Sequence, residues 1–206
     1  MKKDYTHIEF VIDRSGSMQG MALEAQNSVN EFVKDQLAVE GEATFSLTEF
    51  DNKFDTLYDF VSLDTVQEYT LVPRGSTALM DAVGQRISVA GDRFAKMSES
   101  ERPEKVVFVI VTDGGENASQ EFTREQVKGM IEKQQSQFDW AFVFLAANQD
   151  AFAAAASYGI STANSMSFAA NGQGVTKGIG NISCSVSNYR GSATMDSGSI
   201  LGDDDN

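Results

Sequence analysis

A run of six apolar residues, 106–111, is the feature that most constrains how this chain folds. A strand that is apolar at every position has to be covered on both faces, as happens in the middle of a parallel sheet. Residues 140–146 have the same character, and so do residues 8–12, where only Glu9 interrupts the run. The sequence therefore predicts a mostly parallel sheet with helices on both faces.

Helical patterns alternate with these strands. Apolar residues recur at intervals of three and four along residues 22–37 and 79–97, which places them on one face of a helix. We expect a third helix to begin at Thr123, where Gln126 completes a capping box, and an alanine-rich fourth helix over residues 150–158. Strands that alternate with helices imply right-handed crossovers and an α/β, doubly wound sheet.

Two segments depart from this alternation. Residues 43–50 alternate between apolar and polar, and a turn separates them from a second extended run at 54–61, so we expect a hairpin at the sheet edge. After residue 161 the chain becomes rich in Gly, Ser and Asn. There we expect a short strand near 164–168, a helix across 174–182 and a loose acidic tail. The predicted organisation is a domain over 1–170 and an extension over 171–206, partly packed on the domain.

Charge and cysteine content limit the expected partners. The formal net charge of −14 repels phosphate backbones and anionic lipids, so we expect no nucleic-acid or membrane partner. A basic protein or a cation is the better guess. The single cysteine, Cys184, excludes an intrachain disulfide, and the first residues resemble neither a secretory signal nor a membrane span. We therefore expect a cytoplasmic protein.

Oxygen-bearing side chains follow two of the predicted buried strands. Asp13, Ser15 and Ser17 come after the first strand, and Asp113 follows the run 106–111. The carboxyl ends of parallel strands meet at one edge of a sheet, and two carboxylates there repel each other unless a cation lies between them. Carboxylates and hydroxyls suit Mg²⁺, Ca²⁺ or Mn²⁺, and no His or Cys in these loops favours zinc.

The pattern Asp13-x-Ser15-x-Ser17 resembles the signature of the metal-ion-dependent adhesion site of von Willebrand factor A (VWA) domains. The family also supplies a threonine in a phrase similar to residues 75–82, which read GSTALMDA and make Thr77 the candidate. A family aspartate at the end of the fourth strand matches Asp113. The resemblance covers roughly residues 5–168.

The resemblance implies a Rossmann-like sheet of about six strands with one antiparallel edge strand. It also implies one divalent cation, Mg²⁺ or else Ca²⁺ or Mn²⁺, with an open coordination position that accepts an Asp or Glu carboxylate of a partner protein. The implied metal residues are Asp13, Ser15, Ser17, Thr77 and Asp113.

Other readings of these residues stay open at this point. Ser15 or Ser17 could cap the following helix, although capping explains neither aspartate. Asp81 is expected in the first turn of its helix as a carboxylate favoured by the helix dipole. Glu116 and Asn117 could form the rim of the site or be solvated, and we slightly favour the second reading. Residues 148–150 end a strand at the same edge and are open to both readings, whereas His7 is expected to be structural.

Catalysis is not expected. Phosphoryl-transfer hydrolases with an aspartate nucleophile generally need a second aspartate two residues on, where this chain has Ser15, and His7 is the only histidine.

Small intracellular proteins of this family resemble those of bacteria and phages, some of which work with MoxR-type AAA+ ATPases. The alternative is a structural or assembly component, in which the metal only holds the loops together and the Gly/Ser/Asn-rich segment orders on assembly.

Overall fold

The computed structural model describes residues 1–147, 151–192 and 196–201. Its sheet has six strands in the order β3-β2-β1-β4-β5-β6. All neighbours are parallel except the edge pair β2 and β3, which is antiparallel. The predicted Rossmann-like, doubly wound architecture with one antiparallel edge strand is confirmed. The strands are β1 (Lys2–Asp13), β2 (Glu42–Phe50), β3 (Phe54–Ser62), β4 (Pro103–Thr112), β5 (Ala141–Ala147) and β6 (Ser165–Phe168).

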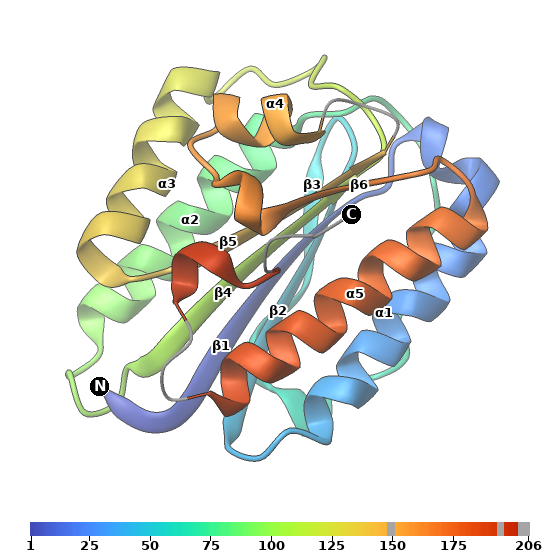
Figure 1. The fold of residues 1–206 in the computed structure, drawn as a ribbon. Coiled ribbons are helices and arrows are strands. Elements are labelled where there is room, and N and C mark those ends of the chain that lie inside the picture. Colours follow the sequence, from blue (N-terminus) through green and yellow to red (C-terminus); the bar gives the residue numbers. More distant parts are fainter. Residues whose placement is uncertain (148–150, 193–195, 202–206) are drawn as a thin grey trace.

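Helices cover both faces of this sheet (Figure 1). One face carries α1 (Ala22–Leu37) and α5 (Gly172–Gly191), and the other carries α2 (Leu79–Lys96), α3 (Arg124–Phe138) and α4 (Ala151–Ser157). Short 3-10 helices occupy Gly16–Met21, Leu63–Thr65, Thr162–Asn164 and Ser197–Ser199. Within the described ranges, no helix combines the length and the apolar character that crossing a membrane requires.

The hydrophobic core has two halves because side chains alternate along each strand. In β1, Ile8, Phe10 and Ile12 pack on the side of α1 and α5, whereas Val11 packs on the side of α2. The capping box expected at the start of α3 is present: the Thr123 hydroxyl accepts a hydrogen bond from Gln126 N, and the Gln126 side chain accepts one from Thr123 N.

The C-terminal helix is longer than expected. We predicted a helix across 174–182 and then a loose tail, but α5 continues to Gly191 and belongs to the same core cluster as α1. Its buried residues recur at helical intervals, and Gly178 allows a close approach to β5, where an added β-carbon would lie 3.0 Å from Leu145. The change of composition at residue 170 is therefore not the end of the core. The buried hydrophobic residues of α5 are Val175, Ile179, Ile182, Val186 and Tyr189.

This packing also removes one argument for an assembly role. The buried residues of α5 find their apolar contacts within this chain, in the same core cluster as α1. The acidic residues 203–205, which we expected to be a solvated tail, lie outside the described residues.

Candidate metal centre

The ends of β1 and β4 bring the two predicted aspartates to one edge of the sheet. The strands are parallel neighbours in which Ile12 lies opposite Val111, so the residues that follow them are also adjacent. Thr112 Oγ1 donates a hydrogen bond of 2.7 Å to Asp13 Oδ2, and Asp113 is the next residue. Sheet topology alone therefore places both carboxylates at the same loop cluster.

The two predicted serines lie between these aspartates. The backbone N–H of Ser15 donates to Asp13 Oδ1 at 2.7 Å, and the hydroxyl oxygens of Ser15 and Ser17 are 3.0 Å apart. Ser17 Oγ donates to Asp113 Oδ1 at 2.8 Å. Ser15 occupies the N-cap position of the short helix Gly16–Met21, but its side chain makes no capping hydrogen bond. The geometry therefore disfavours the reading of Ser15 as a cap.

Thr77 reaches the same place from a different loop. Gly114 follows Asp113, and a β-carbon added to it would lie 3.6 Å from Thr77 Oγ1 and 3.9 Å from Ser17 Oγ. The structure thus brings together all five predicted residues. In the described part of the chain, no three His, Cys, Asp or Glu side chains form a group that could hold a metal ion. The three hydroxyls are therefore an essential part of this donor set.

The electrostatics of the cluster fit a cation. Asp13 is fully buried, and this burial raises its pKa to about 6, aided by the charge of Asp113 and opposed by hydrogen bonds from Thr112 and Ser15. Burial also raises the pKa of Asp113, against hydrogen bonds from Ser17 and Ser15. A divalent cation would stabilise both charged forms, and two carboxylates with three hydroxyls are suitable ligands for a hard ion.

Asn117, in the loop after Asp113, holds Thr77 in place, a role that the sequence did not reveal. Thr77 N donates to Asn117 Oδ1 at 3.0 Å, and Thr77 O accepts from Asn117 N at 3.0 Å and from Ala118 N at 3.2 Å. Glu116 Oε2 accepts from Met80 N at 2.8 Å, at the start of α2. Asn117 is exposed and Glu116 is half-buried, so Asn117 is solvated as we slightly favoured, but both side chains also bond backbone amides.

Asp81 lies in the first turn of α2, as expected, but it does more than interact with the helix dipole. Its carboxylate accepts hydrogen bonds of 2.8–2.9 Å from three consecutive amides, those of Gln120, Glu121 and Phe122. Asp81 therefore ties the helix that follows Thr77 to the loop that follows Asp113. Residues 148–150, whose role stayed open, lie outside the described residues.

We expect Asp81→Ala to lower the free energy of unfolding by about 1–3 kcal/mol, because three amides lose a charged acceptor. Hydrogen–deuterium exchange should accelerate at the amides of residues 120–122. Asp92→Ala, an exposed position on the same helix, is the control and should leave these amides unchanged. Unaltered exchange in Asp81→Ala would contradict the proposed tie.

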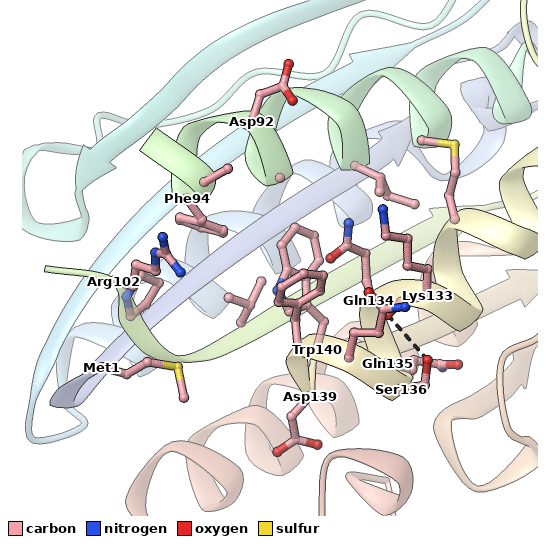
Figure 2. A pocket seen from close by; sticks show the side chains of 18 of the residues that line it. Met1, Asp92, Phe94, Arg102, Lys133, Gln134, Gln135, Ser136, Asp139 and Trp140 are labelled. Atoms are coloured by element: carbon pink, nitrogen blue, oxygen red, sulfur yellow. Dashed lines mark hydrogen bonds between the residues drawn. The ribbon is translucent and has the colours of Figure 1, made fainter. Parts of the chain in front are cut away.

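A cavity of the described residues lies elsewhere. It has a volume of about 880 Å³ and is lined by Phe94, Val106 and Trp140, with Arg102 and Lys133 at its margin (Figure 2). Val106 is near the start of β4, whereas Asp113 follows the end of this strand. The cavity and Asp113 therefore lie at opposite ends of the strands. None of the five predicted metal residues lines this cavity.

No family model matches the sequence. No curated protein matches it either. Solved structures do match. The von Willebrand factor type A protein from Catenulispora acidiphila gives a TM-score of 0.63 at 12% identity, over 89% of this chain and 42% of that one. Proximal thread matrix protein 1 from the mussel byssus, whose metal-ion-dependent adhesion site (MIDAS) motif is occupied by zinc, gives a TM-score of 0.62 at 16% identity, over 89% of this chain and 46% of that one.

The vWF domain of the type V pili tip protein Mfa5 from Porphyromonas gingivalis gives a TM-score of 0.59 at 12% identity, over 92% of this chain and 97% of that domain. This chain spans less than half the length of the first two proteins. At these identities the likeness concerns the fold, and the three agree on it. The chain has the von Willebrand factor A fold.

Proposed function

We propose that this protein binds one divalent cation and uses it to bind a carboxylate of a protein partner. Asp13, Ser15, Ser17, Thr77 and Asp113 would hold the ion. The observation that carries the proposal is the convergence of two carboxylates and three hydroxyls, delivered by three separate loops, at the edge where β1 and β4 end. When bound, the ion supplies positive charge and a coordination position for an external oxygen.

The chain's own residues prepare this site in two ways. Hydrogen bonds from Thr112 Oγ1 and Ser15 N orient the carboxylate of Asp13, and Ser17 Oγ orients that of Asp113. The contacts of Asn117 with the Thr77 peptide hold that hydroxyl beside them. A site assembled before the ion arrives loses less conformational entropy on binding.

The oxygen-only donor set supports Mg²⁺, with Ca²⁺ or Mn²⁺ as substitutes. The byssal protein similar in fold has a MIDAS motif occupied by zinc, so metal selectivity has to be measured for this chain. We propose recognition without catalysis. In support, His7, the only histidine, is buried and contacts Thr44 and Glu9 in the sheet, at 3.0 and 3.3 Å, away from the aspartates.

A protein partner in the cytoplasm of a bacterium or of a phage-infected cell is the context that we propose. The partner would present an Asp or Glu side chain, and a MoxR-type AAA+ ATPase is one candidate. The support for a protein partner is the strong net negative charge, which disfavours nucleic acid and anionic membranes.

The test combines metal titration with partner capture. Calorimetric titration with Mg²⁺ and Mn²⁺ should give one site in the wild type, and Thr77→Ala should weaken binding at least tenfold. Tagged protein should capture a partner from bacterial lysate in Mg²⁺, but not in EDTA and not as Thr77→Ala. Thr65→Ala is the matched control. The Thr65 hydroxyl donates a hydrogen bond to Ser62 O at the end of β3, and Ser62 pairs with the start of β2. Thr65 therefore lies at the opposite end of the strands from the predicted metal residues.

Two outcomes would contradict the proposal. Absence of metal binding by the wild type would remove its basis. A partner retained equally in Mg²⁺, in EDTA and by Thr77→Ala would place recognition on another surface and reduce the metal to a structural element of the loops.

A further inference from the structure

Asp51 is a buried carboxylate at the junction of three loops, and the metal site does not use it as a ligand. It follows β2 directly and is 1% exposed. Asp51 Oδ2 accepts hydrogen bonds from Arg14 Nε at 3.0 Å and from Arg74 Nε at 2.7 Å, and Oδ1 accepts from Lys53 N at 2.8 Å. Both carboxylate oxygens are therefore engaged by the protein.

The partners of Asp51 adjoin the predicted ligands. Arg14 lies between Asp13 and Ser15 in the chain. On the other side, Asp51 O accepts from Ala78 N at 2.7 Å, and Ala78 follows Thr77. One residue thus holds the loop that contributes Asp13, Ser15 and Ser17, and also the loop that contributes Thr77.

Backbone contacts between the same two loops accompany this junction. Arg74 N donates to Arg14 O at 2.7 Å, and Gly16 N donates to Gly75 O at 3.2 Å. Gly75 has a φ of 71°, and a β-carbon there would lie 2.6 Å from Asn52 Oδ1 and 3.1 Å from Asp51 Cβ. The two loops therefore approach each other closely beside the Asp51 side chain.

The charges explain why this junction is stable. The Arg14 side chain is only 5% exposed, and besides Asp51 it pairs with Glu49 and Asp55. Burying a guanidinium without an anionic partner would be strongly unfavourable, and the three carboxylates offset this cost. The ion pairs therefore fix the position of the Arg14 side chain. The backbone of Arg14, which joins two predicted ligands, is held with it.

We propose that Asp51 is a positioning residue of the metal centre, which sets the distance between the Asp13–Ser17 loop and Thr77 through Arg14, Arg74 and Ala78. This inference rests on the proposed metal binding. Substituting Asp51 should lower metal affinity although Asp51 does not touch the ion. For groups that orient metal ligands, such losses are about 10–100-fold.

The test compares Asp51→Asn with Glu9→Gln. Glu9 is also a fully buried carboxylate paired with a buried arginine, Arg86, but it lies four residues before Asp13 within β1. Unfolding by urea in EDTA measures what each variant loses in stability. Calorimetric titration with Mn²⁺ alone measures metal affinity. We expect both variants to lose stability, whereas only Asp51→Asn loses affinity, by tenfold or more.

Arg74→Gln is the second variant, in case Asp51→Asn does not fold. The Arg74 side chain is 58% exposed, and its loss leaves the pair of Asp51 with Arg14, so the protein should fold and bind Mn²⁺ about threefold to tenfold more weakly. Wild-type affinity in Asp51→Asn would overturn the inference, and so would equal losses in Asp51→Asn and Glu9→Gln. If Asp51→Asn does not fold, wild-type affinity in Arg74→Gln would overturn it. A wild type that binds no Mn²⁺ would instead overturn the proposed function itself.

Discussion

Asp13→Asn is expected to change the stability of this protein in opposite directions with and without a divalent cation. Asp13 is fully buried near the half-buried Asp113, and in the described residues it forms no ion pair with Lys, Arg or His. In EDTA the amide removes a buried charge, and Thr112 and Ser15 can still bond to it. We therefore expect a gain of about 1–3 kcal/mol in the free energy of unfolding.

In saturating Mn²⁺ the wild type should instead be more stable than Asp13→Asn. An ion at one thousand times its dissociation constant stabilises the wild type by about 4.1 kcal/mol, which exceeds the gain expected in EDTA, and Asp13→Asn should lose most of this because a ligand carboxylate is gone. Urea unfolding curves in EDTA and in Mn²⁺ measure both effects. The control is Asp59→Asn, which breaks ion pairs with Arg86 and Arg93 and should destabilise equally in both buffers. A variant that is less stable than wild type in EDTA and gains as much from Mn²⁺ would refute this account.

Arg86→Met is expected to cause the largest loss of stability among these single substitutions. Arg86 holds both oxygens of Glu9, with Nε–Oε1 at 2.7 Å and Nη2–Oε2 at 3.1 Å, and both side chains are 5% exposed or less. Removing the guanidinium leaves the charge of Glu9 buried inside the sheet. The expected cost is about 3–5 kcal/mol.

The double variant Glu9→Gln/Arg86→Met separates charge burial from packing. Without the carboxylate no uncompensated charge is left, so the double variant should be more stable than Arg86→Met alone, by about 1–3 kcal/mol. Urea unfolding of the two single variants and the double variant gives the coupling energy directly. If the effects of the two substitutions simply added, the pair would have no energetic role beyond packing.

The sequence by itself predicted the parallel sheet and placed Asp13, Ser15, Ser17 and Asp113 after its strands, whereas Thr77 was implied only by the resemblance to VWA domains. Runs such as 106–111 are apolar at every position, which only a strand covered on both faces satisfies. Once a doubly wound sheet is inferred, Asp13 and Asp113 are expected on the same side of it, because parallel strands end there together. The strand order of the structure, with β1 beside β4, makes them neighbours. These signals are local or depend only on topology, so they can be read from the chain.

Tertiary structure alone decided the full length of α5 and the contacts that hold the loops. The glycines, serines and asparagines of α5 have weak helix propensity, and burial of Val175, Ile179 and Val186 against α1 and the sheet makes the helix stable. Asp51 and Asp81 accept hydrogen bonds from residues up to 41 positions away in the chain. No local pattern encodes such partners, because the free energy of these bonds arises only after the sheet has brought the loops together.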